Sequence, residues 1–135
     1  MHPSEPLNDY LLIFRGPDWD RDLDIEQTEQ TLDRVNAWCS ALASQGKVKG
    51  GLALQREGRI VSGKKGQLVL DGPFAESKEA IGGYLILAAQ DLEEAIAVAQ
   101  DCPTLEYGIS IEVRPARPDC PITERLRERK AEALA

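Results

Sequence analysis

The sequence contains little of the chemistry on which most metal and redox sites depend. Its 135 residues include a single histidine, His2, and three cysteines, Cys39, Cys102 and Cys120. No two of the cysteines have C-x-x-C spacing. A structural zinc site needs four such ligands at close spacing. We therefore expect no metal site and no cofactor.

The chain also lacks a long apolar run and an excess of basic charge. No stretch approaches the roughly 18 apolar residues of a membrane helix, and residues 1–6 lack the features of a secretory signal, so we expect a cytoplasmic protein without a membrane partner. The net charge is −7, which argues against nucleic acid as a partner. Acidic residues concentrate in the first third: Asp18, Asp20, Asp22, Asp24, Glu26, Glu29 and Asp33.

The first half of the chain predicts a strand, a helix and a second strand. Residues 10–14 are an almost wholly apolar run that is too short for a helix, so they indicate a buried strand. Asp24 and Gln27 are spaced as a capping box, and Gly46 is placed to end the helix. Residues 48–54 return to strand character. The apolar stripe expected to face inward comprises Ile25, Thr28, Leu32, Val35, Cys39 and Leu42.

The second half predicts a hairpin, a strand, a helix and a last strand. Residues 59–61 and 67–70 form the arms of the hairpin, and residues 83–89 form a strand. Asp91 caps a helix with Leu92, Ala95, Ile96 and Ala99 on its inner face, and residues 107–114 alternate as a strand. Without the inserted hairpin, this order is the α+β ferredoxin-like split β-α-β fold, an antiparallel sheet with two helices on one face.

The predicted fold leaves one face of an apolar sheet uncovered. Because buried-looking strands need cover on both faces, we expect a second copy of the chain there. The expected organisation is a tail over residues 1–8, one domain over 9–115, and a proline-rich connector with a short helix over 116–135. Thr123 is the expected cap of that helix.

One segment imitates a phosphate-binding loop. Residues 58–65 have the glycine and lysine spacing of a P-loop, but Lys65 stands where the metal-binding Ser or Thr belongs. A P-loop also lies between a strand and a helix, whereas here strand character lies inside the motif. We interpret this segment as the hairpin with a basic tip.

The most informative motif is the tetrapeptide Asp71, Gly72, Pro73, Phe74, which follows an apolar strand. An acidic-lysine stretch and a Gly-Gly-Tyr strand, residues 82–84, come after it. Together with the Glu-Val-Arg-Pro ending at 112–115, this pattern resembles the YCII-related family in its DGPF-type branch. The resemblance implies a dimeric α+β barrel, a homodimer in which two ferredoxin-like sheets pack face to face.

Asp71 is the candidate catalytic residue, because a carboxylate fixed at a strand end beside a charged loop is a typical site feature. Its plainer role is an Asx turn that fastens the strand end. The candidate substrate-binding neighbours are Arg15, Glu76, Lys78 and Tyr84. Arg15 suits a substrate carboxylate, although Asp18 or Asp20 could equally pair with it.

The resemblance also shows a departure. YCII-type members pair a helix histidine with an aspartate as a proposed dyad, whereas the first helix here has Asn36 and Trp38 in that region. Trp38 suits core or dimer contact, Cys39 a small core position, and Cys102 and Cys120 exposed but unreactive positions.

The leading hypothesis is binding of an unknown small organic molecule near the DGPF turn, with an unknown reaction possible. The alternative is a non-catalytic assembly module.

Overall fold

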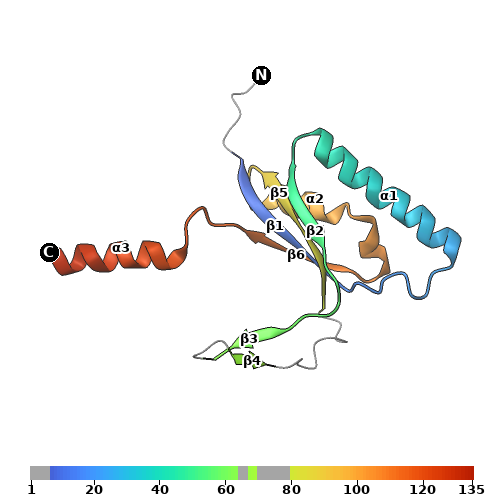
Figure 1. Cartoon of the computed structure of the whole chain (residues 1–135). Coiled ribbons are helices and arrows are strands. Elements are labelled where there is room, and N and C mark those ends of the chain that lie inside the picture. The colour runs from blue at the N-terminus through green and yellow to red at the C-terminus, as the bar shows by residue number, and fades with distance from the viewer. Residues whose placement is uncertain (1–6, 64–66, 70–79) are drawn as a thin grey trace, which may run out of the picture.

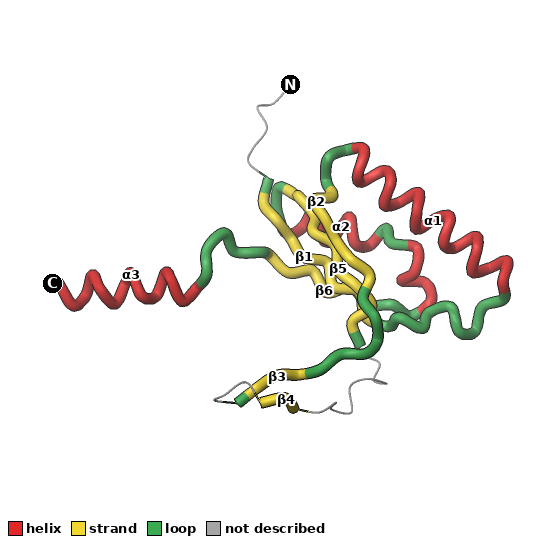
Figure 2. Tube along the Cα trace, in the orientation of Figure 1, coloured by secondary structure: helices red, strands yellow, loops and turns green. Residues whose placement is uncertain are grey.

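The computed structural model describes residues 7–63, 67–69 and 80–135. Figures 1 and 2 show a sheet with two helices on one face, a separate hairpin and a projecting C-terminal helix. The strands are β1 (Asn8–Arg15), β2 (Val48–Ala53), β3 (Ile60–Ser62), β4 (Gln67–Val69), β5 (Ile81–Ala89) and β6 (Ser110–Pro115). The helices are α1 (Ile25–Ser44), α2 (Leu92–Gln100), the 3₁₀ helix η2 (Pro103–Tyr107) and α3 (Pro121–Leu134).

The main sheet has the order β2-β5-β1-β6, with every neighbouring pair antiparallel. This is the ferredoxin-like arrangement, with β3 and β4 as a separate two-stranded hairpin inserted between β2 and β5. The predicted fold class and the inserted hairpin are therefore confirmed. β3 begins inside the P-loop-like segment, and the two strands of the hairpin pair with each other rather than leading into a helix.

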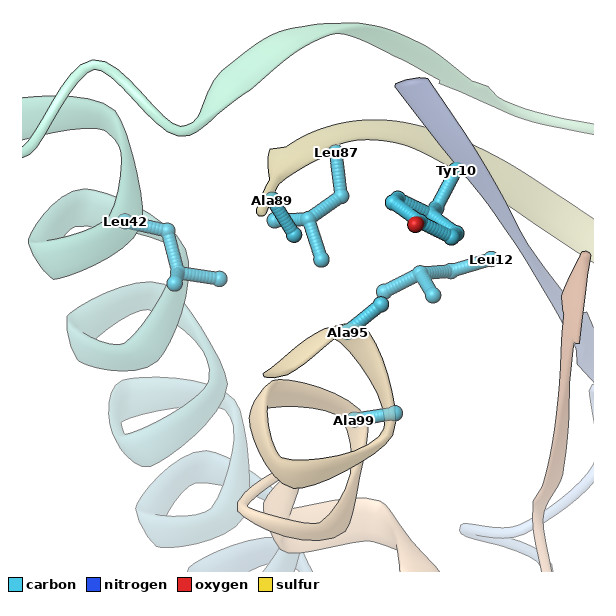
Figure 3. Close-up of a cluster of buried hydrophobic side chains, with 7 residues drawn as sticks. All are labelled: Tyr10, Leu12, Leu42, Leu87, Ala89, Ala95 and Ala99. Carbon is cyan, nitrogen blue, oxygen red and sulfur yellow. The ribbon is translucent and has the colours of Figure 1, made fainter. Parts of the chain in front are cut away.

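The core lies between the central strands and the two helices (Figure 3). Strand alternation turns one set of side chains of β1 and β5 toward α1 and α2. The alanines of α2 let its backbone approach the sheet closely, so Leu12 and Leu87 are completely buried. The buried cluster consists of Tyr10, Leu12, Leu42, Leu87, Ala89, Ala95 and Ala99.

The predicted caps of α1 and α2 are confirmed, but the predicted inner stripe of α1 is partly wrong. Asp24 and Gln27 form the capping box, and Asp91 accepts from Glu94 N–H at 2.8 Å. On α1, Ile25 is 80% exposed and Leu32 46% exposed. The helix instead buries Thr31, whose hydroxyl donates to the Gln27 carbonyl at 2.8 Å and is thereby satisfied inside the protein.

Four further expectations are corrected. Tyr107 ends η2 rather than opening the last strand, because Gly108 takes a left-handed conformation (φ 94°) that reverses the chain before Ser110. Cys102 is buried rather than exposed. The last helix begins at Pro121 after Cys120, not at Thr123, because proline is preorganised for the first helical position. On α2, Leu92 and Ile96 stay more than a third exposed, and the alanines fill the inner face.

The sheet face opposite the helices is apolar at its centre. The register aligns Leu11 with Ile86 and Ile13 with Tyr84 on this face, and it places Leu52 of β2 beside Tyr84. Leu11, Ile13 and Ile86 are half-buried, and Leu52 is exposed. We call the surface formed by Leu11, Ile13, Leu52, Tyr84 and Ile86 the open face.

β2 and β5 approach each other so closely that glycine is required on both strands. A Cβ added to Gly83 would lie 2.8 Å from the Leu52 carbonyl oxygen, and one added to Gly51 would lie 2.6 Å from that of Tyr84. Both obstacles are backbone atoms, so a new side chain must push the strands apart.

We therefore expect Gly83→Ala to lower the free energy of unfolding by about 1–3 kcal/mol, the usual cost of overpacking. Urea unfolding measures the change. Gly58→Ala is the matched control, because a Cβ there meets no atom within 4 Å; a surface change of this kind stays within about 0.5 kcal/mol. Equal stabilities of the two variants would contradict the close approach of β2 and β5.

Candidate functional site

A cavity of about 630 Å³ lies between α1 and the β2–β5 side of the sheet. Its volume is within the range of small-molecule sites, roughly 300–1,000 Å³. α1 lies against β2 and η2, while α2 lies against β5 and β6. The cavity is thus bounded by α1 above β2, by η2 at one side and by the β1–α1 loop.

The floor of the cavity is made of strand positions with little or no side chain. Gly51, Ala53 and Gly83 occupy helix-facing positions of the sheet, where the register pairs them with Leu85, Gly83 and Phe14. Gly51 and Gly83 are the same glycines that the close strand approach requires. Since large side chains are absent from these positions, α1 meets open space there instead of a packed core.

Aromatic side chains form the walls. Trp38 of α1 meets Phe14 of β1 edge to face, with 6.4 Å between ring centroids and 84° between the planes. The Trp38 indole N–H donates to the Val98 carbonyl of α2 at 3.3 Å, which fixes the ring. Trp19 of the β1–α1 loop stacks on Tyr107 with centroids 6.1 Å apart. Phe14, Trp19 and Trp38 all line the cavity.

The polar side-chain atoms of the described lining residues are few and belong to two thiols, two hydroxyls and two indoles. Cys102 shares a hydrogen bond of 3.1 Å with Thr104, and both residues line the cavity with Cys39. Burial raises the pKa of the Cys39 thiol, and the nearby Cys102 adds to this rise. Cys39 is therefore a neutral thiol at physiological pH and an apolar lining group rather than a nucleophile.

Arg15 is not among the residues that line the cavity. Its guanidinium lies 2.9 Å from the Glu112 carboxylate across the β1–β6 pair, and Arg114 also pairs with Glu112. Glu112 is thus held in an ion pair that joins the two strands. Asp18, offered as an alternative partner of Arg15, pairs with Arg21 and Arg56.

Of the remaining candidate site residues, the structure describes one and leaves three outside the described residues. Tyr84 borders the cavity, although strand alternation directs its ring to the open face beside Ile13 and Leu52. Asp71, Glu76 and Lys78 lie outside the described residues. Their assignment as catalytic and binding residues stays a prediction.

Sequence reasoning missed the residues that shape the cavity. Trp38 was expected in the core or at a dimer contact, and Thr104 was not singled out. The available signal was the pair of Gly-Gly dipeptides at 50–51 and 82–83, because glycine inside a strand often marks close approach of a backbone or a ligand.

Among residues 7–63, 67–69 and 80–135, no group of three potential metal ligands occurs. No helix in these ranges is long and apolar enough to cross a membrane.

The Arg15–Glu112 pair predicts a specific acid response. The hydrogen bond from Arg15 lowers the pKa of Glu112 in the folded protein. A carboxylate with a lowered pKa stabilises the fold above its unfolded pKa of about 4.3, and this stabilisation is lost as pH falls through the folded value. Glu112→Gln should therefore be less stable than wild type at pH 7, with the difference vanishing at low pH in urea titrations. Glu106→Gln, at an exposed pair with Arg34, is the control; a difference at Glu112 that is independent of pH would contradict the assignment.

The thiols predict a second pH response. The backbone N–H groups of Ile122 and Thr123 at the start of α3 lower the pKa of the exposed Cys120, in contrast to the unreactive setting expected from sequence. Because the thiolate is the nucleophile, iodoacetamide should label Cys120 with a midpoint below the ordinary value of about 8.5 and Cys39 with a midpoint above it. Peptide mass spectrometry across pH 6.5–10 measures both rates. In urea the two midpoints should converge, and faster labelling of Cys39 at neutral pH would refute the assignment.

Comparisons with known proteins identify the family. One solved structure similar to this chain is 5-chloro-2-hydroxyhydroquinone dehydrochlorinase from Burkholderia phenoliruptrix AC1100, in complex with 2,5-dihydroxybenzoquinone. The two are 17% identical, the alignment covers 80% of this chain and 93% of the other, and the TM-score is 0.44. No curated protein matches the chain. The model of the YCII-related domain matches residues 18–117, so this chain belongs to the YCII-related family.

Proposed function

We propose that the chain is a DGPF-type member of the YCII-related family that binds a small organic molecule in the cavity between α1 and the sheet. The observation that carries the proposal is a cavity of about 630 Å³ that two rigid elements and a glycine floor hold open. A packed domain of this size normally fills such space with side chains.

The lining favours a flat and largely apolar ligand. Phe14 and Trp38 offer aromatic surfaces, and the floor at Gly51 and Gly83 offers flat backbone. The hydroxyl of Thr104 can accept or donate one hydrogen bond in addition to its contact with Cys102. A ligand with one or a few polar groups on an apolar ring system fits these surfaces.

Asp71 is the proposed polar centre of the site. In sequence it lies between β4 and β5, and β5 supplies Gly82 and Gly83 to the cavity. The DGPF pattern and the charged residues Glu76 and Lys78 support this assignment. A carboxylate beside an otherwise apolar ligand could act as acid or base, which would make the chain an enzyme.

The open face supports a homodimer. Leu11, Ile13 and Ile86 are apolar and only half-buried in one chain, and Leu52 is exposed. Packing two such faces together removes this surface from water, in the manner of the dimeric α+β barrel group that the family resemblance implies. The same face favours the alternative function, a non-catalytic assembly module whose cavity stays empty.

A thermal-shift screen against a metabolite set tests binding. A ligand at about 100 times its dissociation constant adds roughly 2.7 kcal/mol of stability, which appears as a rise in melting temperature of several degrees. Ala53→Trp fills the cavity from its floor and should abolish the shift. Ala37→Trp places the same side chain on the exposed side of α1 and should leave the shift unchanged.

Two further readouts locate the ligand. A bound ligand should slow alkylation of Cys39, which lines the cavity, and leave Cys120 unaffected. Asp71→Asn should weaken binding at least tenfold if the carboxylate touches the ligand. A shift that survives in Ala53→Trp would refute the site, and a screen without hits in any variant would favour the assembly module.

A further inference from the structure

The C-terminal helix α3 has the features of a helix that packs against a partner. None of its 14 residues, all of them described, is buried, and Figure 1 shows it projecting away from the domain. An isolated helix of this length is marginal in water. Ile122 is 59% exposed and Leu126 50% exposed, so its apolar side chains lie in solvent.

Most charges of α3 are sorted by face, with Arg127 as the exception. At 100° per residue, Ile122, Leu126 and Ala133 share one stripe. Positive residues lie within and beside this stripe: Arg125, Arg129 and Lys130. The glutamates lie on the opposite side at four-residue spacing: Glu124, Glu128 and Glu132. The apolar stripe of α3 is thus bordered by positive charge, and we call this side the basic face.

α1 carries a complementary surface. Ile25 and Leu32, expected from sequence to face inward, are instead exposed, with Leu32 at the border between the cavity and the solvent-facing surface of the helix. The same wheel places Glu29 next to Ile25, and Asp33 and Glu26 follow further round on the solvent side. α1 therefore presents two apolar side chains with negative charge along their solvent side, and we call this surface the acidic face.

The two faces cannot meet within one molecule as it stands. α1 lies on one side of the sheet, whereas α3 extends from the far side of β6 after the connector 116–120 (Figures 1 and 2). We propose that the basic face of α3 docks on the acidic face of α1 in a second copy of this chain. Because the contact is reciprocal, two chains can exchange their helices about a twofold axis and close the assembly.

The charged and the apolar side chains contribute differently to the contact between α3 and α1. Exposed ion pairs contribute little affinity but select partners and orientation. Burial of Ile122 and Leu126 against Ile25 and Leu32 supplies the attraction. An anionic membrane surface also attracts a helix with basic and apolar residues on one side, but it offers no counterpart to the acidic face of α1.

The test uses the full chain and a readout that a dimer through the open face alone would not change. Hydrogen exchange of residues 121–134 is measured at high and low protein concentration, alongside sedimentation equilibrium. We expect the α3 amides to be protected at high concentration and to exchange at least tenfold faster on dilution. Protection that does not depend on concentration, or no protection at any concentration, would overturn the proposal.

Charge reversal identifies the partner surface. Replacing Arg125, Arg129 and Lys130 by Glu should remove the concentration-dependent protection at least tenfold, and replacing Glu26, Glu29 and Asp33 by Lys should do the same. A mixture of the two variants should restore it, because each supplies one complementary face. The control replaces Glu128, on the other side of α3, by Lys and should behave as wild type.

Two outcomes of these experiments contradict the proposal directly. Failure of the mixed variants to recover protection would show that α1 is not the docking surface. Protection of α3 by vesicles containing phosphatidylserine, without self-protection at high protein concentration, would assign the helix to a membrane surface. Neither outcome depends on whether the cavity binds a ligand.

Discussion

The close approach of β2 and β5 is the constraint on which the rest of the site depends. Gly51 and Gly83 lie where a Cβ would collide with the backbone of the facing strand. The same two positions point toward α1, so the requirement for glycine also removes side chains from the helix-facing surface. The two strands are therefore closely packed within the sheet, but they carry no side chains at these two helix-facing positions. The missing side chains leave the space of the cavity.

α1 can span the empty region because it is held at other points. Leu42 enters the buried cluster near the end of the helix, and the Trp38 indole bonds to the Val98 carbonyl of α2. The capping box at Asp24 satisfies the start of the helix without help from the sheet. A long helix fixed at its end and along one face does not need to collapse onto the glycine floor.

The sequence predicted the elements well because their signals are local. The capping box, the apolar runs and the alternation of strands each depend on a few neighbouring residues, and together they specify the ferredoxin-like order. The start of the last strand was mispredicted at Tyr107, because the left-handed Gly108 ends a 3₁₀ helix there before the strand begins. Pro121 likewise began α3 two residues before the expected cap at Thr123.

The site was less predictable because it depends on which way a helix turns its faces. A three- and four-residue periodicity in α1 fits more than one rotation of the helix, and the stripe from Ile25 to Leu42 is the one that the apolar residues favour. The actual rotation buries Thr31 and brings Trp38 to the cavity, leaving Ile25 outside. Tertiary packing determines that the polar Thr31 is buried and the apolar Ile25 is exposed. A helical wheel holds no information about tertiary packing.

Leu32 connects the two surfaces of α1. It lines the cavity and is nevertheless 46% exposed, so it lies where the cavity reaches the surface of the helix. A helix docked on Ile25 and Leu32 covers that border. Ligand binding and association would then act on one shared side chain, and any coupling between them must be reciprocal: a ligand that orders Leu32 in the docked position strengthens association by the same factor as association strengthens its own binding. The exposed leucine that the sequence had placed in the core is thus the residue through which the two activities of α1 would meet.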